Sequence, residues 1–340
     1  MTKPINNYSD EYKKEKRSLL YDGAKLGILL LVYEILQNIV SNIYYYAAYF
    51  FITKDFSTDR SVVVGYFSEH QSLLTSTAFK MTRYVSTTIL CVGTVMILAK
   101  FLLHTGAGKF LKPSKGFAKT AAIWFPGCFL INAVFTLLFS YIMAFFSSSG
   151  ISIPSSDLSI SSPSKGAIIM QFAYTIIVAP MVEEYIYRGL VLGSLSKYSK
   201  SAAVLFSALS FGLMHGNLPQ AVSAFLTGLL YAAIAVNCGS IIPTIIIHSL
   251  NNIFAGFPNF AKAMNIPHYE TIYSAFVIII ALGGLFTLCT HHAQLNIKQE
   301  DNGAIPLKKV NKYIFTNPFL IFYLCALIFL IAASIVLANR

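Results

Sequence analysis

Charged residues are scarce in this chain of 340 residues. They make up 11% of the sequence, whereas a soluble domain usually carries about a quarter. Hydrophobic residues supply 56%, and the mean hydropathy is +0.63. A chain with so little polar surface cannot fold in water, because its apolar segments must face lipid or one another. The composition excludes a soluble globular domain and indicates an integral membrane protein.

Cysteine is also sparse, and no two cysteines have the CxxC spacing. The five cysteines lie in or beside apolar segments, at Cys91, Cys128, Cys238, Cys289 and Cys325. We interpret them as small core residues, which excludes a disulfide framework and a cysteine metal site. No small-residue cleavage site follows the basic N-terminal stretch, so we expect the first apolar segment to be retained.

Acidic residues are outnumbered, with 14 Asp and Glu against 25 Lys and Arg and a net charge of +11. In a soluble protein such an excess can indicate nucleic-acid binding. Here the basic residues flank apolar segments, where they set the membrane topology and contact anionic lipid. We therefore predict the lipid bilayer as a partner and no nucleic acid.

Apolar segments of membrane-spanning length are abundant. An α-helix needs roughly 20 apolar residues to cross the ~30 Å hydrocarbon layer. About nine segments meet this length, with centres near Ile39, Met96, Val134, Tyr174, Ser207, Leu229, Ile247, Ile279 and Phe329. None alternates polar and apolar residues with a period of two, which argues against a β-barrel. The predicted fold is an all-α, polytopic transmembrane helix bundle of about eight to nine spans.

The chain divides into three parts by sequence. Residues 1–164 hold the first spans and end in a Ser-rich loop, residues 165–260 hold the polar motifs described next, and residues 261–340 hold the last spans. The N-terminus and alternate loops are basic, so the positive-inside rule predicts a cytoplasmic N-terminus and, with nine spans, an external C-terminus. The expected location is a plasma membrane, most simply that of a bacterium.

Ionisable residues at bilayer depth are costly, and usually face a protein interior or a water-filled cavity. Three predicted spans carry them, in the motifs Glu183-Glu184-x-x-x-Arg188, Phe211-x-x-x-His215 and His248-x-x-x-Asn252. At ~1.5 Å per residue, the three motifs lie roughly 14–22 Å from the turns at the cytoplasmic side. We expect them to meet in one layer that is reached from the cytoplasm.

The spacing within the motifs favours hydrolysis of an amide bond. Glu184 and Arg188 share one helical face and can pair, whereas Glu183 points about 100° away and is free to face a cavity. A carboxylate in a low-dielectric site can act as general base toward water. Histidine and carboxamide groups on neighbouring helices can hold that water or donate to the developing oxyanion.

Structural roles compete with the catalytic ones for the same residues. A lone His215 is more often a satisfied core histidine, and the Glu184–Arg188 pair can simply fix its helix. Asn252 can join two helices, and Asn251 competes with it for any catalytic role. For Glu34, in the first span, pairing with a polar neighbour is favoured over a function.

The three motifs, in this order and each on a predicted span, resemble those of the CAAX protease and bacteriocin-processing family, also called Abi, which includes the type II CAAX prenyl proteases. The likeness covers about 90 of the 340 residues. It implies an intramembrane endopeptidase acting on a membrane-associated peptide or protein, cleaved near a lipidated or C-terminal site, in peptide or bacteriocin processing or self-immunity. By resemblance six residues carry the reaction: Glu183 as base, His215 on the water, His248 and Asn252 as the oxyanion site, and Glu184 and Arg188 as supports.

Two alternatives stay open at this point. Members of the family are often labelled metalloproteases, and Glu183, His215 and His248 could ligate Zn²⁺; the sequence has no HExxH helix, and we favour a reaction without a tightly bound metal. The alternative function is a non-catalytic immunity factor or a proton-coupled transporter, because intramembrane Glu and His also form proton relays. The close clustering of the motifs and the absence of an inverted repeat argue against a transporter.

Overall fold

The computed structural model describes residues 5–103, 108, 110–154, 164–299 and 303–339, and these residues form helices and connecting turns with no strand. The long helices are α1 (Ile5–Thr53), α4 (Thr77–Leu102), α5 (Phe117–Ser148), α10 (Leu218–Cys238), α11 (Ile242–Ala263), α12 (Tyr269–His291) and α14 (Pro318–Ala338). The shorter ones are α2 (Arg60–Glu69), α3 (Gln71–Thr75), α9 (Lys200–Leu213), α13 (Leu307–Phe315) and the 3₁₀ turn η4 (His292–Leu295).

One further long helix runs through residues 165–195 without interruption. It consists of α6 (Lys165–Ala173), the π-helical η2 (Tyr174–Val178), α7 (Ala179–Glu184), the π-helical η3 (Tyr185–Leu192) and α8 (Gly193–Leu195). We call it the glutamate helix, because it carries Glu183 and Glu184 near its middle.

All nine predicted span centres fall within helices, so the all-α polytopic bundle is confirmed. Seven helical segments of the described chain are long and apolar enough to cross a membrane. The two predicted spans outside this set are α9 and α11. With 14 residues, α9 is only ~21 Å long, and α11 is diluted by its own polar motif. These two helices bring the histidine motifs, so the departures from an ordinary span coincide with the candidate site.

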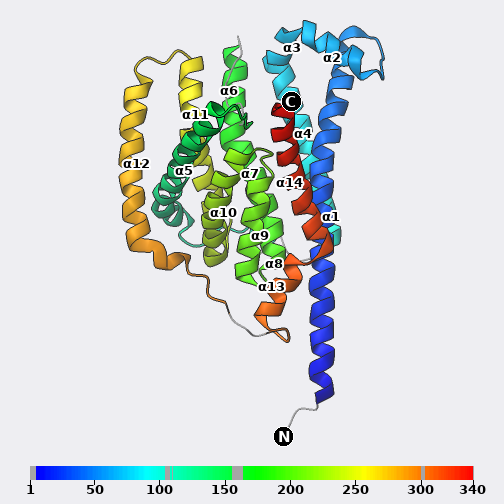
Figure 1. Ribbon diagram of the computed structural model, residues 1–340, viewed down its shortest axis with the longest axis vertical. Helices are drawn as coiled ribbons and strands as arrows, with labels where there is room; N and C mark the ends of the chain where they lie inside the picture. The colour runs from blue at the N-terminus through cyan, green and yellow to red at the C-terminus, as the bar shows by residue number, and fades with distance from the viewer. Residues whose placement is uncertain (1–4, 104–107, 109, 155–163, 300–302, 340) are drawn as a thin grey trace.

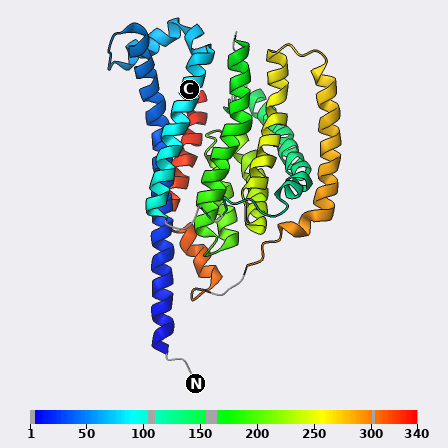
Figure 2. The same cartoon turned by 180° about the vertical axis from the view of Figure 1, so that it is seen from behind.

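The helices stand side by side, with α1 at one edge of the bundle and α12 at the other (Figure 1). In both side views α4 and α14 lie next to α1, and the glutamate helix, α9, α10 and α11 fill the middle (Figures 1 and 2). The ends of α1 and α14 nearest the chain termini lie at opposite ends of the bundle (Figure 1). This is the arrangement that an odd number of spans requires.

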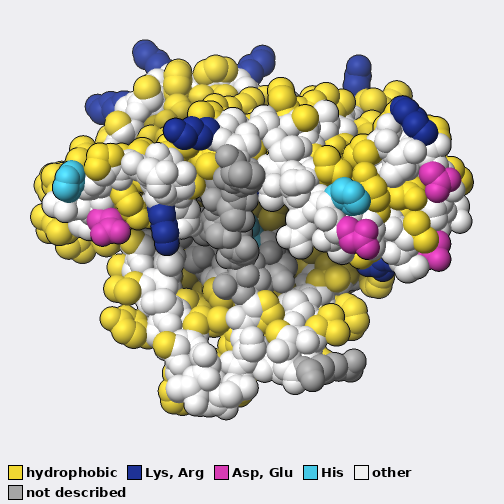
Figure 3. Space-filling model, turned by 90° about the horizontal axis from the view of Figure 1, so that it is seen from above, with side chains coloured by type: hydrophobic (Ala, Val, Ile, Leu, Met, Phe, Trp, Pro, Cys, Tyr) yellow, Lys and Arg dark blue, Asp and Glu magenta, His cyan; other side chains and the backbone are white. Residues whose placement is uncertain are grey.

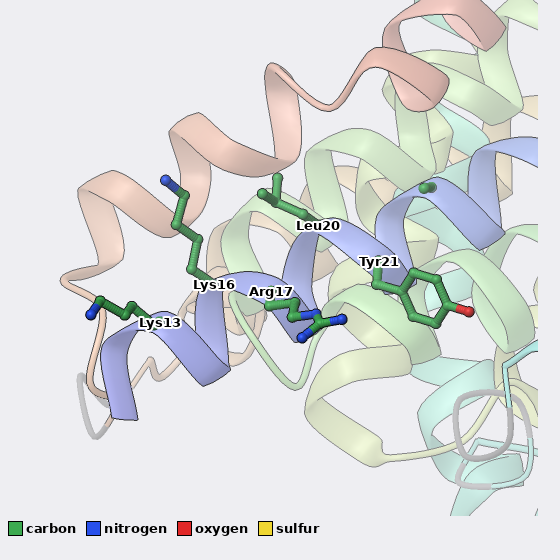
Figure 4. Close-up of a pocket in the computed structure, with 6 residues that line it drawn as sticks. Lys13, Lys16, Arg17, Leu20 and Tyr21 are labelled. Carbon is green, nitrogen blue, oxygen red and sulfur yellow. The ribbon is translucent and has the colours of Figure 1, made fainter. Parts of the chain in front are cut away.

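The first turns of α1 project beyond the other helices (Figure 1). Contacts hold this projection to the rest of the chain: the Glu15 carboxylate accepts the backbone N–H of Ala304 at 2.7 Å, and Lys197 pairs with Asp22 at 2.6 Å. A surface hollow of about 450 Å³ lies against the same turns, lined by Lys13, Lys16, Arg17, Leu20, Tyr21 and Ala24 (Figure 4). It shares no residue with the three motifs, so we do not place the chemistry there.

Close helix packing surrounds the glutamate helix. Gly212 of α9 lies so near α10 that a Cβ atom there would be 2.5 Å from the carbonyl oxygen of Ala221. At Gly228 of α10, a Cβ would lie 3.2 Å from the guanidinium of Arg188. Small residues at these two positions allow α9 and α10 to approach each other and leave room for a buried arginine.

Candidate active site

The glutamate helix is irregular on both sides of its two glutamates, where η2 and η3 are π-helical. Such turns are rare and are frequently found at functional sites. In η2 the N–H of Ala179 donates to the carbonyl of Tyr174, five residues earlier. The following bond of this kind would run from residue 180 to the carbonyl of Thr175, but Pro180 has no N–H to donate. Asn252 of α11 donates its side-chain amide to this carbonyl at 2.9 Å. The helix break and the third motif are therefore joined directly.

Glu184 and Arg188 form the ion pair that their spacing predicts. The Arg188 Nη1 to Glu184 Oε1 distance is 3.0 Å, and both side chains are 0% exposed. Arg188 also donates through Nη2 to the carbonyl of Gly228 at 3.2 Å. The bond to Gly228 joins the glutamate helix to α10, and removing either partner of the ion pair would leave an uncompensated buried charge.

The Arg188 guanidinium lies 4.2 Å from the centre of the Phe211 ring and 5.3 Å from that of Tyr231. Cations at such distances are attracted to the ring face, more so where water is absent. In the sequence, Phe211 begins the second motif, and no role was assigned to it. It is buried, and its ring also meets those of His215 at 5.1 Å and His248 at 5.5 Å, each edge to face.

His248 lies between the two glutamates. Its Nδ1 is 3.1 Å from Glu184 Oε1, and its Nε2 is 3.6 Å from Glu183 Oε2. A carboxylate on one ring nitrogen fixes the orientation of an imidazole and the direction of the other nitrogen. Glu184 thus has a second role that the spacing did not predict, because it orients the histidine that faces Glu183.

His215 follows the last turn of α9 in a tight turn. Its Nδ1 lies 2.8 Å from the carbonyl oxygen of Phe211, so it is the natural donor of that bond. This leaves Nε2 for other partners. The side chain is close enough to Glu183 and His248 to interact electrostatically with both. The structure therefore brings together Glu183, His215 and His248 as the sequence predicted.

The two neighbouring asparagines of α11 serve different partners. Asn251 is buried and donates to the Tyr231 hydroxyl, and the Tyr231 ring lies 5.4 Å from that of His248. Asn252 is half-buried and reaches the glutamate helix. Tyr231 was missed by the sequence analysis, because a single tyrosine in an apolar span carries no spacing signal.

Access to Glu183 is one-sided. The side chains of residues 186–195, toward the N-terminal face of the bundle, are all buried, whereas none of residues 169–179 is. On α11, likewise, none of residues 252–260 is buried. Seen from this opposite face, the described side chains are mostly hydrophobic or uncharged, with charged groups scattered among them (Figure 3). Glu183, with 18% of its side chain exposed, lies at this boundary. The expected approach from the N-terminal face is therefore not supported, because packed side chains fill it.

A metal was an alternative for the same residues. In the described part of the chain, no three or more His, Cys, Asp or Glu side chains are grouped to hold a metal ion. Glu183, His215 and His248 do not form such a group, since His248 Nδ1 contacts Glu184 and His215 Nδ1 contacts a backbone carbonyl. We route no chemical step through a metal.

Comparison with known proteins supplies one match. Residues 165–254 match the family model described as type II CAAX prenyl endopeptidase Rce1-like. No curated protein and no solved structure matches the chain. The matched segment spans all three motifs and every residue of the candidate site, so the family resemblance predicted from the motifs is confirmed for this segment.

Proposed function

We propose that this chain, whose residues 165–254 form a domain of the type II CAAX prenyl endopeptidase family, cleaves peptide bonds within the membrane by a base-catalysed attack of water. The observation that carries the proposal is the orientation of the His248 ring. The buried Glu184 carboxylate contacts Nδ1 of His248, and Nε2 of the same ring faces Glu183. A largely buried carboxylate facing an oriented imidazole, in an otherwise apolar layer, is a suitable site for general base catalysis.

In the proposed reaction, Glu183 takes a proton from a water molecule that His215 helps to hold. The water oxygen attacks the carbonyl carbon of the substrate, and the carbonyl oxygen gains the negative charge. The carbon–nitrogen bond then breaks, and Glu183 returns its proton to the leaving nitrogen. The products are a carboxylic acid and an amine, so atoms and protons balance.

The oxyanion needs hydrogen-bond donors in a dry site. We assign this role to Asn252, through the N–H that does not donate to Thr175, and to His248, which donates through Nε2 when both of its ring nitrogens carry a proton. Asn252 then has two roles, since its other N–H closes the helix break at Pro180. Glu184 and Arg188 position the helix and the imidazole without contacting the substrate.

The finer assignments rest on the family alone. We propose a membrane-associated peptide or protein as substrate, with a lipidated or C-terminal cleavage site, and peptide or bacteriocin processing or self-immunity as its setting. The alternative, a non-catalytic immunity factor or a proton-coupled transporter, uses the same buried groups without cleavage. The expected location is a plasma membrane with the N-terminus in the cytoplasm.

The decisive variant is Glu183→Gln, which removes the base and keeps the size of the side chain. We expect melting in detergent close to that of the natural protein, and turnover of membrane peptides lower by at least ~100-fold, the lower end of what a positioned general base contributes. The readout is the peptide content of membranes with and without each protein. Unchanged peptide products, or immunity retained without cleavage, would refute the protease proposal.

A further inference from the structure

Two asparagines of α1, Asn38 and Asn42, are exposed at the edge of the bundle. α1 stands at this edge, with α4 and α14 beside it (Figures 1 and 2). Both asparagine side chains are exposed, and so are Ile35, Ile39 and Ile43. At 100° per residue the five residues lie within an arc of about 140° on one face of the helix. α1 therefore presents to its surroundings a face that combines isoleucines with carboxamides.

Both carboxamides lie at the depth of the hydrocarbon layer. Gly27 of α1 packs against Phe319, the second residue of α14, where a Cβ atom on the glycine would lie 2.6 Å from the Phe319 carbonyl carbon. α14 has 21 residues, a length of ~31 Å that matches the layer. Asn38 and Asn42 follow Gly27 by 11 and 15 residues, or ~17 and ~23 Å along α1. They are therefore alongside the second half of α14, inside the layer.

α1 itself satisfies only part of these side chains. Asn38 donates one amide N–H to the carbonyl of Glu34 at 3.0 Å, and Asn42 donates one to the carbonyl of Asn38 at 2.7 Å. A carboxamide has two N–H donors and an oxygen acceptor. In the described part of the chain, each amide keeps one N–H and its oxygen without a partner. Because such groups are costly in an apolar layer, they require a partner from outside this copy of the chain.

A simpler explanation is that the two amides reach the lipid headgroups, as long side chains do near the end of a span. An asparagine side chain is too short for this, because Asn38 lies ~12 Å from the level at which α14 ends. The opposite edge of the bundle shows how a lipid-facing helix is built. Residues 275–286 of α12 include no polar side chain, and Phe276, Ile279 and Leu282 are exposed. Contact with lipid alone therefore does not account for the carboxamides of α1.

We infer that this face of α1 binds a second copy of the chain, and that the asparagines of the two copies hydrogen-bond to one another across the contact. A two-fold axis places the same face of both copies in contact. A carboxamide is both donor and acceptor, so it can pair with an identical group. Residues 35–43 include no charged side chain that would repel a copy, and Oε1 of the neighbouring Glu34 is buried.

The spacing of the exposed residues suits close packing of two identical helices. Ile35, Ile39 and Ile43 are four residues apart and form one ridge, and Asn38 and Asn42 form the next. Ridges of this kind interdigitate between helices, and polar side chains join helices in membranes by hydrogen bonds. α1 packs against α4 and α14 on its other side, so the exposed face needs no rearrangement to bind. A second copy supplies matching amides at the matching depth, whereas an unrelated helix does so only by chance.

Crosslinking of the full-length protein in its own membranes tests the contact. The exposed Cys289 and Cys325 are first replaced by serine, and then Ile35 or Ile39 by cysteine. Under mild oxidation we expect at least one of these two variants to form a disulfide-linked dimer as its main product. Ile279→Cys is the matched control, because this isoleucine is also exposed in the middle of a span, at the α12 edge. It should form little dimer.

The contribution of the amides is measured by energy transfer between full-length copies in phosphatidylcholine vesicles. Asn38→Leu with Asn42→Leu keeps the size of both side chains and removes their hydrogen-bonding groups. We expect this double variant to associate about tenfold more weakly, as the loss of interhelical hydrogen bonds implies. Its melting in detergent should stay close to that of the natural protein. Asn38→Gln with Asn42→Gln keeps the amides and should associate more strongly than the leucine variant.

Three outcomes would overturn the inference. Equal dimer yields from the α1 and α12 cysteines would report only random collision. Association that the leucine variant retains in full would show that the amides do not make the contact. A natural protein that stays monomeric in vesicles, while Ile39→Cys crosslinks to a different protein in membranes, would show that the face binds a partner helix. None of these measurements depends on cleavage, so the inference can fail while the proposed function stands.

Discussion

The glutamate helix has two halves that differ in packing. From Ile186 to Leu195 every side chain is buried in the main core, whereas residues 169–179 are half-buried or exposed. The packed half fixes Arg188 and, through Glu184, the imidazole of His248. The other half packs less tightly against its neighbours. The comparison shows that the reactive groups lie where a tightly packed interior, which orients them, meets less buried side chains.

The largest expected effect is in the packed half. Glu184→Ala and Arg188→Ala should each lower the free energy of unfolding by about 3–5 kcal/mol, because each leaves a buried charge without its partner. Melting in detergent and folded yield measure this loss. Gln171→Ala in the less tightly packed half is the control and should change melting little. Normal melting of both pair variants would show that the pair does not hold the helix.

Variants of Asn252 and Asn251 should distinguish a residue that acts in the reaction from one that only stabilises the fold. Asn252→Ala should lower the rate constant by about 100-fold or more, as expected for a lost oxyanion donor, and should also destabilise the protein by about 1–3 kcal/mol by leaving the Thr175 carbonyl unpaired. Asn251→Ala leaves the Tyr231 hydroxyl unpaired, so we expect a similar loss of stability and a smaller loss of rate. Equal rate losses in both would remove the special role of Asn252.

Two glycines, Gly212 of α9 and Gly256 of α11, allow tight and loose packing to be compared by the same substitution. Gly212→Ala should destabilise the protein by about 1–3 kcal/mol, because the added Cβ meets the backbone of α10 and the helices must separate. At Gly256 of α11 the Cβ would lie 3.1 Å from the ring of Phe172, a side chain that can shift. Gly256→Ala should therefore melt close to the natural protein. If the two variants melt alike, the difference in packing is smaller than the structure indicates.

Orientation in the membrane has no expected effect on stability and is tested by labelling. Lys309 and Lys165 are exposed on opposite faces of the bundle, and each is replaced by cysteine in turn. In intact cells an impermeant thiol reagent should label the Lys165 variant and spare the Lys309 variant. The natural exposed cysteines, Cys289 and Cys325, are first replaced by serine. The reverse pattern would place the N-terminus and the packed half outside.

Much of the fold was predictable from sequence, because hydropathy and helical rise act locally. The positions of the nine predicted span centres within helices and the Glu184–Arg188 pair both follow from spacing along single helices. The shortness of α9 was less visible, since its apolar residues continue into the turn before His215. The direction of access is not predictable in this way, because depth can be counted along one helix whereas packing depends on its neighbours.

The sequence by itself determined that this chain lies in a membrane, that three helices bring polar motifs to one depth, and that these motifs belong together. Only the tertiary structure decided which groups touch: His248 between two glutamates, Asn252 on the carbonyl freed by Pro180, and Phe211 against both histidines. Spacing sets the face and height of a side chain on its own helix. Its partner depends on how closely helices approach, and small residues such as Gly212 and Gly228 set that distance.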